Sequence, residues 1–314
     1  MSSVRAVTIG SRGSALALRQ TDLVRQALCR VAPELDVTVK TVRTRGDRER
    51  DAALASFGGA GVFVRSLEEA LLAGEIDLAV HSMKDLPTAE PARLVIAAVP
   101  PREDPHDALI SSVATAVDDL PREARVGTGS PRRRAQLLRR RPDLAVIGLR
   151  GNLDTRLRRL NEGRYDAIVL AAAGLNRLGL ADRIGALLPY DVMLPAAGQG
   201  ALAVQVRNDD DALRAVVAGI DDADTRAAVT AERAFLRALA GGCHVPAGAH
   251  AAVADGRLRV MACILSPDGA DAVRGTRDGP PQDAEAVGAA LAAALLDQGG
   301  RALLARGPRE SDGA

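Results

Sequence analysis

Hydrophobic positions along the chain fall into short apolar runs that alternate with longer stretches of helical periodicity. Three short apolar runs have the length and composition of buried strands, at residues 4–9, 76–80 and 94–99. Helical patterns follow the run at 4–9 and precede the run at 76–80. The same alternation returns over 125–172. Because strands that alternate with helices imply crossover connections, the sequence predicts an α/β fold with mostly parallel sheets.

Two segments are predicted to carry the chain from one lobe to another. Residues 100–105 contain three prolines and stiffen the chain after the strand at 94–99. Residues 194–200 lead back, and 201–206 read as a strand that rejoins the first lobe. Two α/β lobes joined by paired crossings leave a cleft, which is a common place for a ligand.

The pattern changes after residue 220 and predicts a small α+β domain. An alanine-rich amphipathic helix over 224–239 is followed by two strand-like runs joined at Asp255-Gly256, a strong hairpin signal. A helix over 284–297 closes the domain. The predicted organisation is therefore a first lobe of residues 1–100 and 201–219, a second lobe of 101–200, and a C-terminal domain of 220–314.

Basic residues gather where predicted strands lead into helices. Ser130, followed by Pro131, can cap one helix and Asn152 another, and helix N-termini favour anions. Guanidinium groups match carboxylates and phosphates with two parallel hydrogen bonds. We therefore expect one wall of a polyanion site here, although solvated helix faces are the alternative for the same residues. The arginines concerned are Arg132, Arg133, Arg134, Arg150 and Arg156, and Arg177 follows a later strand.

The first strand ends in the same way, with Arg12 in a glycine turn and Ser14 as a helix cap. Further along, Lys84 and Asp85 follow the strand at 76–80, and polar groups at this end of a parallel strand lie at the ligand crevice. They are the best acid and base candidates, or else an exposed ion pair in a loop. Cys243 lies in a glycine turn, where a nucleophile, a metal ligand and an inert thiol all stay open. With no second cysteine nearby, no metal site is expected.

Composition narrows the class of protein. The 314 residues carry a net charge of +1, so the basic stretches are local. Aromatic residues make up 2%, too few for the stacking surface that single-stranded nucleic acid needs. No apolar run reaches membrane-spanning length, the N-terminus lacks a signal-peptide pattern, and three cysteines suggest no disulfide framework. These features predict a cytoplasmic protein that binds neither nucleic acid nor membranes.

The residues named so far resemble one family, hydroxymethylbilane synthase, also called porphobilinogen deaminase. The resemblance covers nearly the whole chain. Each motif alone is weak, but all of them in this order are highly specific. They occupy residues 9–14, 80–87, 102–105, 126–133, 149–152, 194–200 and 241–243.

The resemblance implies two lobes like those of periplasmic binding proteins and a small α+β C-terminal domain whose cysteine holds a covalent dipyrromethane cofactor. It implies a monomeric enzyme that adds four porphobilinogen units head to tail to the cofactor, releasing ammonia and then hydroxymethylbilane. Asp85 matches the catalytic aspartate and Cys243 the anchoring cysteine. The cofactor contacts match Lys84, Ser130, Arg132 and Arg133, and the substrate contacts match Arg12, Ser14, Arg150, Arg156 and Arg177.

Three positions depart from the family pattern. Ser56 and Ala60 stand in the long polar loop where lysines are frequent, which puts a lysine-based lid contact in doubt. Gly129 stands where a serine is common. A non-catalytic binding or effector-sensing protein with the same two lobes is the alternative function. It would explain the arginines but neither the third domain nor Cys243.

Overall fold

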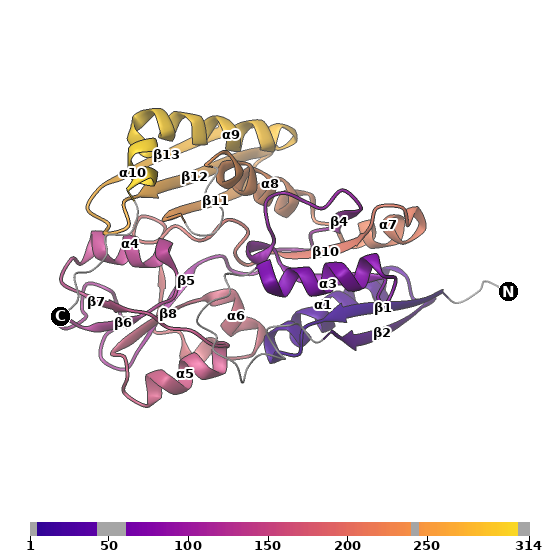
Figure 1. Ribbon diagram of the computed structural model, residues 1–314, viewed down its shortest axis with the longest axis horizontal. Helices are drawn as coiled ribbons and strands as arrows, with labels where there is room; N and C mark the ends of the chain where they lie inside the picture. The colour runs from indigo at the N-terminus through magenta and orange to yellow at the C-terminus, as the bar shows by residue number, and fades with distance from the viewer. Residues whose placement is uncertain (1–4, 43–60, 240–244, 307–314) are drawn as a thin grey trace. The chain divides into compact units, whose positions relative to one another are not determined.

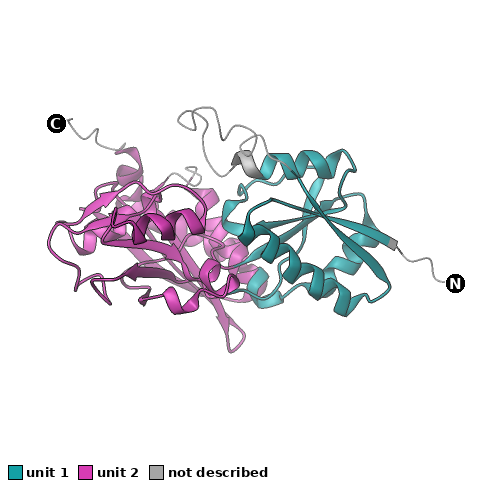
Figure 2. Cartoon of the chain, turned by 90° about the horizontal axis from the view of Figure 1, so that it is seen from below, with its two compact units in different colours: residues 1–103, 201–226 teal, residues 104–200, 227–314 magenta. Residues whose placement is uncertain are grey.

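The computed structural model describes residues 5–42, 61–239 and 245–306. The chain divides into two compact units, coloured separately in Figure 2: unit 1 comprises residues 1–103 and 201–226, and unit 2 comprises 104–200 and 227–314. The chain passes between the units at 103/104, at 200/201 and at 226/227. The division into three domains expected from the sequence stays a prediction.

Unit 1 contains a five-stranded sheet in the order β2-β1-β3-β10-β4 (Figure 1). Strands β1 and β2, and β1 and β3, pair in parallel, while β10 is antiparallel to both of its neighbours. Four of the five strands therefore share one direction, as the alternating pattern predicts. The strands are β1 (Arg5–Ser11), β2 (Leu35–Thr41), β3 (Leu78–Ser82), β4 (Leu94–Ala98) and β10 (Leu202–Arg207).

Helices cover both faces of this sheet. Helices α1 (Ala15–Val31) and α7 (Asp211–Val217) share one core with β1, β3 and β10, and α3 (Gly61–Leu72) packs on the other face. For α1 the sequence predicts Leu16, Leu23, Ala27 and Leu28 on one side of the helix. Leu28 is fully buried, Ala27 packs against the same core, and Leu16 and Leu23 are half-buried, so the prediction is confirmed in part. The polar Gln20 and Thr21 are buried as well, because they bond to the ends of β3 and β1.

Unit 2 repeats the same sheet with different strands, in the order β7-β6-β8-β5-β9. Strand β6 pairs in parallel with β7 and β8, and β5 is antiparallel to β8 and β9. Helix α4 (Pro131–Arg140) packs on one face through Leu137 and α5 (Leu153–Asn161) on the other through Leu157. The strands are β5 (Asp107–Ser111), β6 (Arg125–Gly127), β7 (Ala145–Ile147), β8 (Ala167–Ala171) and β9 (Ala186–Leu188), and α6 (Ala172–Arg177) follows β8.

The C-terminal part of unit 2 is an antiparallel sheet, β11-β12-β13, under two helices. Helix α8 (Ala223–Ala238) and α9 (Ala284–Leu295) share a core with one face of the sheet. On the other face, Cys263 and Leu265 pack against Ala135 of α4. The strands are β11 (Ala247–Ala254), β12 (Arg257–Leu265) and β13 (Ala272–Gly279), and α10 (Arg301–Ala305) ends the described chain.

The hairpin predicted at Asp255-Gly256 is confirmed, because both residues have the positive φ angles that a tight turn of this kind requires. The predicted α/β class with mostly parallel sheets and a small α+β part is also confirmed. Strands β5, β9 and β13 and helix α7 were not predicted, because their short or polar sequences carry little periodicity. Among the described helices, none combines the length and apolar character needed to cross a membrane.

Candidate functional site

The first group of candidate residues follows β3 in unit 1. Met83 and Leu86 are buried at 1% and 5% exposure, and between them Lys84 and Asp85 are half-buried in the short 3-10 helix η1 (Met83–Asp85). The Met83 amide donates to the Ala201 carbonyl at 3.0 Å, which ties this turn to the start of β10. Two apolar anchors thus hold a lysine and a carboxylate at the carboxyl end of a parallel strand.

Helix α1 braces the same turn with polar side chains. Gln20 donates through Nε2 to Ser82 Oγ at 2.9 Å, and Thr21 donates to Ser11 Oγ at 2.8 Å. Ser14 caps the helix, accepting from the Ala17 amide at 3.3 Å. The cap predicted for Ser14 is confirmed, and the half-buried Arg12 lies in the turn between β1 and this cap.

His81 lies in β3 just before this turn and is 5% exposed. Burial in a low-dielectric surrounding, together with the positive charge of Arg12, lowers the pKa of His81 to about 4. The imidazole is therefore neutral at pH 7. No role was predicted for His81, because nothing in a sequence shows that a histidine in a strand is fully enclosed.

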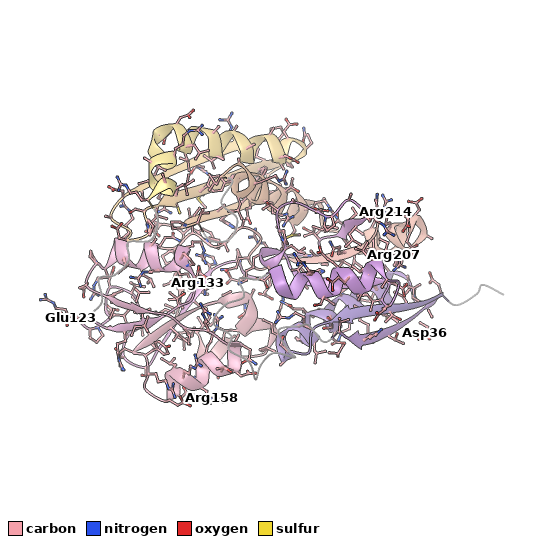
Figure 3. All side chains as sticks on the ribbon, in the orientation of Figure 1. Asp36, Glu123, Arg133, Arg158, Arg207 and Arg214 are labelled. Atoms are coloured by element: carbon pink, nitrogen blue, oxygen red, sulfur yellow. The ribbon has the colours of Figure 1, made fainter. Side chains whose placement is uncertain are left out.

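The second group is centred on the start of α4 in unit 2. Ser130 caps the helix by accepting from the Arg133 amide, with Pro131 at the first helical position, as predicted. The next two side chains turn inward, with Arg132 and Arg133 each 5% exposed (Figure 3 labels Arg133). The neighbouring Arg134 is exposed and donates to the Val146 carbonyl. Arg132 and Arg133 therefore lie neither on a solvated helix face nor on the open wall of a ligand site.

Both buried arginines bind one carboxylate, that of Asp107 in β5, which is 0% exposed. Arg132 Nη1 lies 2.6 Å from Asp107 Oδ2, and Arg133 donates to Oδ1 from Nε at 2.9 Å and Nη2 at 2.7 Å. Burial alone would raise the pKa of Asp107. The charges of Arg132 and Arg133 outweigh it and hold the pKa of this carboxyl well below its usual range.

A third donor and two main-chain carbonyls complete this buried cluster. Gln199 Nε2 donates to Asp107 Oδ1 at 2.9 Å, and the Leu194 carbonyl accepts from Arg132 Nη1 at 2.7 Å. Arg133 Nη1 donates to the Val169 carbonyl at 2.9 Å. The sequence analysis missed Asp107 and Gln199. The one available signal was a carboxylate at the head of the apolar run that forms β5.

The charges of the cluster do not balance. Two buried guanidinium groups face one buried carboxylate, which leaves one positive charge in a low-dielectric region. Nε of Arg132 is buried and has no hydrogen-bond partner in residues 5–42, 61–239 and 245–306. Since buried donors normally find acceptors, a carboxylate-bearing group fits this place by both charge and hydrogen bonding.

The remaining arginine candidates lie at the same edge of the unit 2 sheet, after β7 and β8. Asn152 caps α5 by accepting from the Thr155 amide at 3.0 Å, as predicted. Arg150, just before it, is exposed. Arg156 Nε donates to the Gly151 carbonyl at 2.8 Å, and Arg177 Nη2 donates to the Gly200 carbonyl at 2.7 Å. Parallel strands thus gather Arg132, Arg150 and Arg177 at one edge of the sheet.

Some of the predicted site lies outside the described residues. These are Cys243, which the resemblance makes the cofactor anchor, and the loop positions Ser56 and Ala60. Gly129 is described, and a Cβ added to it would lie 2.8 Å from the Leu149 carbonyl oxygen. No group of three or more potential metal ligands occurs in the described part of the chain.

The fold and the arginine-lined sheet edge define a class, that of α/β proteins built to bind a ligand with several carboxylates or phosphates. Two family models match the chain. The model described as "Porphobilinogen deaminase, dipyromethane cofactor binding domain" matches residues 7–215, and "Porphobilinogen deaminase, C-terminal domain" matches 226–297. The chain belongs to the porphobilinogen deaminase family.

Curated relatives agree with this assignment. The porphobilinogen deaminase of Syntrophotalea carbinolica is 50% identical over 303 residues, covering 96% of each chain. That of Roseiflexus castenholzii is 51% identical over 300 residues, covering 96% of this chain and 99% of the relative. A periplasmic substrate-binding protein from Coxiella burnetii is 16% identical, with a TM-score of 0.43 over 68% of this chain and 91% of that one. This last likeness is too weak to bear on function.

Proposed function

We propose that the protein is a transferase that joins four porphobilinogen units head to tail on a covalent dipyrromethane primer, releasing ammonia and then hydroxymethylbilane. The observation that carries the proposal is the buried, net-positive cluster of Arg132, Arg133 and Asp107 in a chain of this family. Each pyrrole ring of the substrate carries an acetate and a propionate. A cluster with an unbalanced positive charge is suited to hold such rings.

In unit 1 we assign Asp85 as the catalytic carboxylate. It is half-buried, so it can be reached by substrate, and Met83 and Leu86 fix the turn that carries it. A carboxylate in this position can stabilise positive charge on a pyrrole ring and move protons to and from it. Lys84 beside it is proposed to contact a carboxylate of the cofactor. Arg12 and Ser14 are proposed to bind carboxylates of the substrate.

In unit 2 we assign Ser130, Arg132 and Arg133 to the cofactor. The dipyrromethane group supplies the primer on which the product is built. Asp107 fixes both guanidinium groups, so their donors are oriented before any ligand arrives, and less conformational entropy is lost on binding. Arg150, Arg156 and Arg177 are proposed to hold the carboxylates of the added rings.

The test is an intact mass of the purified protein, followed by peptide mapping. We expect added mass equal to two linked pyrroles, located on the peptide that contains Cys243. A colour reaction with an aldehyde reagent for dipyrromethanes gives an independent readout. An active enzyme without this added mass would overturn the assignment of the anchor. A modified protein that releases no ammonia from porphobilinogen would overturn the proposed reaction.

Cytoplasmic localisation, a monomeric state and the absence of a nucleic-acid partner are part of the proposal and rest on the sequence. Size-exclusion chromatography with light scattering tests the monomer, which a dimer mass would contradict. Salt-dependent binding to DNA or RNA would contradict the third expectation.

A further inference from the structure

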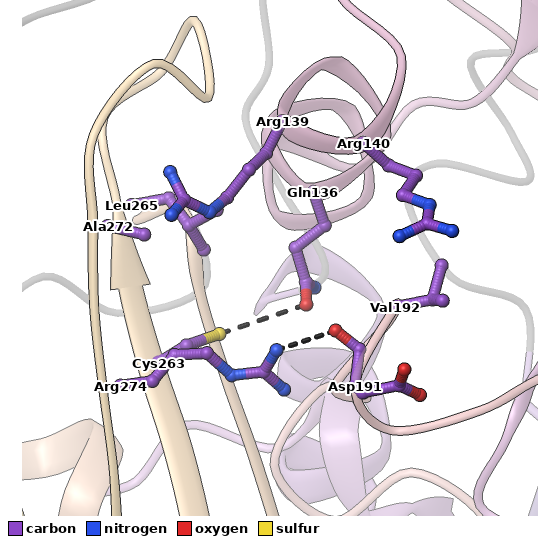
Figure 4. A pocket seen from close by; sticks show the side chains of 9 residues that line it. All are labelled: Gln136, Arg139, Arg140, Asp191, Val192, Cys263, Leu265, Ala272 and Arg274. Carbon is purple, nitrogen blue, oxygen red and sulfur yellow. Dashed lines mark hydrogen bonds between the residues drawn. The ribbon is translucent and has the colours of Figure 1, made fainter.

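A cavity of about 200 Å³ opens at the surface of unit 2, on the opposite end of α4 from Arg132 and Arg133. Its walls come from the last turns of α4, the segment before Leu194, and strands β12 and β13 (Figure 4). Three guanidinium groups line it, those of Arg139, Arg140 and Arg274, with one carboxylate, that of Asp191. Neither the family match nor the proposed reaction assigns a role to this cavity.

Two of these arginines are not neutralised by the protein. Arg139 Nη1 donates to the Ala270 carbonyl at 3.2 Å, and Arg274 Nη1 donates to the Asp191 carbonyl at 2.6 Å. Both acceptors are uncharged main-chain groups. Neither guanidinium forms an ion pair within the described ranges, whereas Arg140 pairs with Asp118. The cavity therefore keeps an excess of positive charge.

The walls are held in place by close packing. Gly269, in the turn between β12 and β13, has φ +75°, and a Cβ there would lie 2.2 Å from the Ala135 carbonyl of α4. The turn can rest on α4 only because this residue is a glycine. Arg139 and Arg274, which both line the cavity, thus come from two elements in fixed contact.

The volume of the cavity and the polar groups in its wall indicate the kind of ligand that it can bind. A cavity of about 200 Å³ is smaller than the 300–1,000 Å³ typical of sites for drug-sized molecules. It has room for several water molecules at ~30 Å³ each, and so for an anion with two charged groups. Gln136 and Cys263 lie at the bottom of the cavity, where Cys263 Sγ is 3.8 Å from Gln136 Oε1, while Gln136 Nε2 donates to the Leu194 carbonyl at 3.0 Å.

We propose that this cavity is a binding site for a small oxyanion with two or more negative charges, of the phosphate or carboxylate type. Arg139 and Arg274 bind the anion, and Gln136 holds the bottom of the cavity through its bonds to Leu194. Gln136 also accepts from the Leu194 amide at 2.8 Å, and the Leu194 carbonyl accepts from Arg132. Leu194 therefore connects Gln136, at the bottom of the cavity, to Arg132 of the buried arginine cluster.

The experiment is calorimetric titration of the purified full-length holoprotein with pyrophosphate, and separately with succinate. The double variant Arg139→Ala/Arg274→Ala should weaken binding by about tenfold or more, since two charged hydrogen-bond donors are lost. The matched control is Arg277→Ala, on the same strand β13, because Arg277 is exposed like Arg274 but does not line the cavity. It should leave the affinity within about twofold.

If the double variant does not fold, Arg139→Ala alone is compared. Absence of binding at millimolar anion, or binding that the double variant leaves unchanged, would overturn the proposal. Binding of pyrophosphate but not succinate would assign the phosphate type, and the reverse result the carboxylate type.

Discussion

In unit 1 the antiparallel strand β10 places Leu202 opposite Ser82, the last residue of β3, whereas in unit 2 strand β5 places Asp107 opposite Ala171, the last residue of β8. The two sheets have the same strand order and the same directions. One topological position is thus apolar in one sheet and a fully buried carboxylate in the other. Shared topology fixes where a side chain lies, but not whether it is charged.

The consequences differ at the two sheet edges. In unit 2 the buried carboxylate binds Arg132 and Arg133 and is not available to a substrate. In unit 1 the carboxylate of Asp85 is half-buried, and the buried titratable group there is the neutral His81. One edge therefore holds its carboxylate between two arginines, and the other leaves a carboxylate partly exposed.

The largest expected effect is on turnover. Asp85→Asn should lower the rate of ammonia release by about 10²–10⁴-fold, the usual contribution of a general acid or base. The urea midpoint should hardly change, because the carboxylate is half-buried. The measurement is steady-state turnover beside a urea titration. Wild-type turnover in this variant would show that the proton is handled elsewhere.

Asp107→Asn should show the opposite pattern, with its main effect on the stability of the folded protein. Removing one partner of a buried ion pair costs about 3–5 kcal/mol, because the remaining charges stay buried without compensation. The urea midpoint and the melting temperature measure it. Asp118→Asn is the matched control, since Asp118 pairs with Arg140 at an exposed site and should cost less than about 1 kcal/mol. Equal losses in the two variants would contradict the comparison.

Acid should weaken unit 1 before unit 2. The folded-state pKa of His81 is about 4, below its ordinary value near 6.5, so the unfolded state takes up a proton first as the pH falls. Stability is lost between pH 6.5 and 4, by about 3 kcal/mol. The depressed pKa of Asp107 means that its contribution persists until the pH falls below the ordinary range of an aspartate, near 4.

Hydrogen exchange read by mass spectrometry separates the two units. At pH 5, after correction for intrinsic rates, peptides of β3 should lose protection relative to pH 7, while peptides of β5 should keep theirs. His81→Gln should remove most of the difference in β3. Equal loss in β3 and β5 would argue against a buried neutral imidazole as the source.

The smallest expected effect concerns a feature that the two sheet edges share, the serine cap of the helix that follows a strand. Ser14 and Ser130 cap the helices that follow β1 and β6, at corresponding places in the two sheets. Ser14→Ala and Ser130→Ala should each cost about 1 kcal/mol of stability, because one helix N–H loses its acceptor. Chemical denaturation measures both. A cost several times larger at one serine would mean that it does more there than cap a helix.

Much of this arrangement could be predicted from the sequence. The caps Ser14, Ser130 and Asn152, the hairpin at Asp255-Gly256 and the parallel strands all follow from local patterns, because each depends on a few neighbouring residues. The buried face of α1 was predicted only in part, since Gln20 and Thr21 bury polar groups whose partners lie on β3 and β1. The pairing of Asp107 with Arg132 and Arg133 spans about 25 residues and leaves no periodic signal.

Local periodicity and motifs in order are enough to give the α/β class, the family and the points where strands lead into helices. Which charges are exposed and which are enclosed depends on contacts between distant segments, and so it follows from the fold alone. Burial removes water, and the pKa of a group then depends on whichever charges the fold brings beside it. For that reason Asp107 and His81 acquired their properties from the fold, and the cavity beside Arg139 and Arg274 from the packing of β12 and β13 on α4.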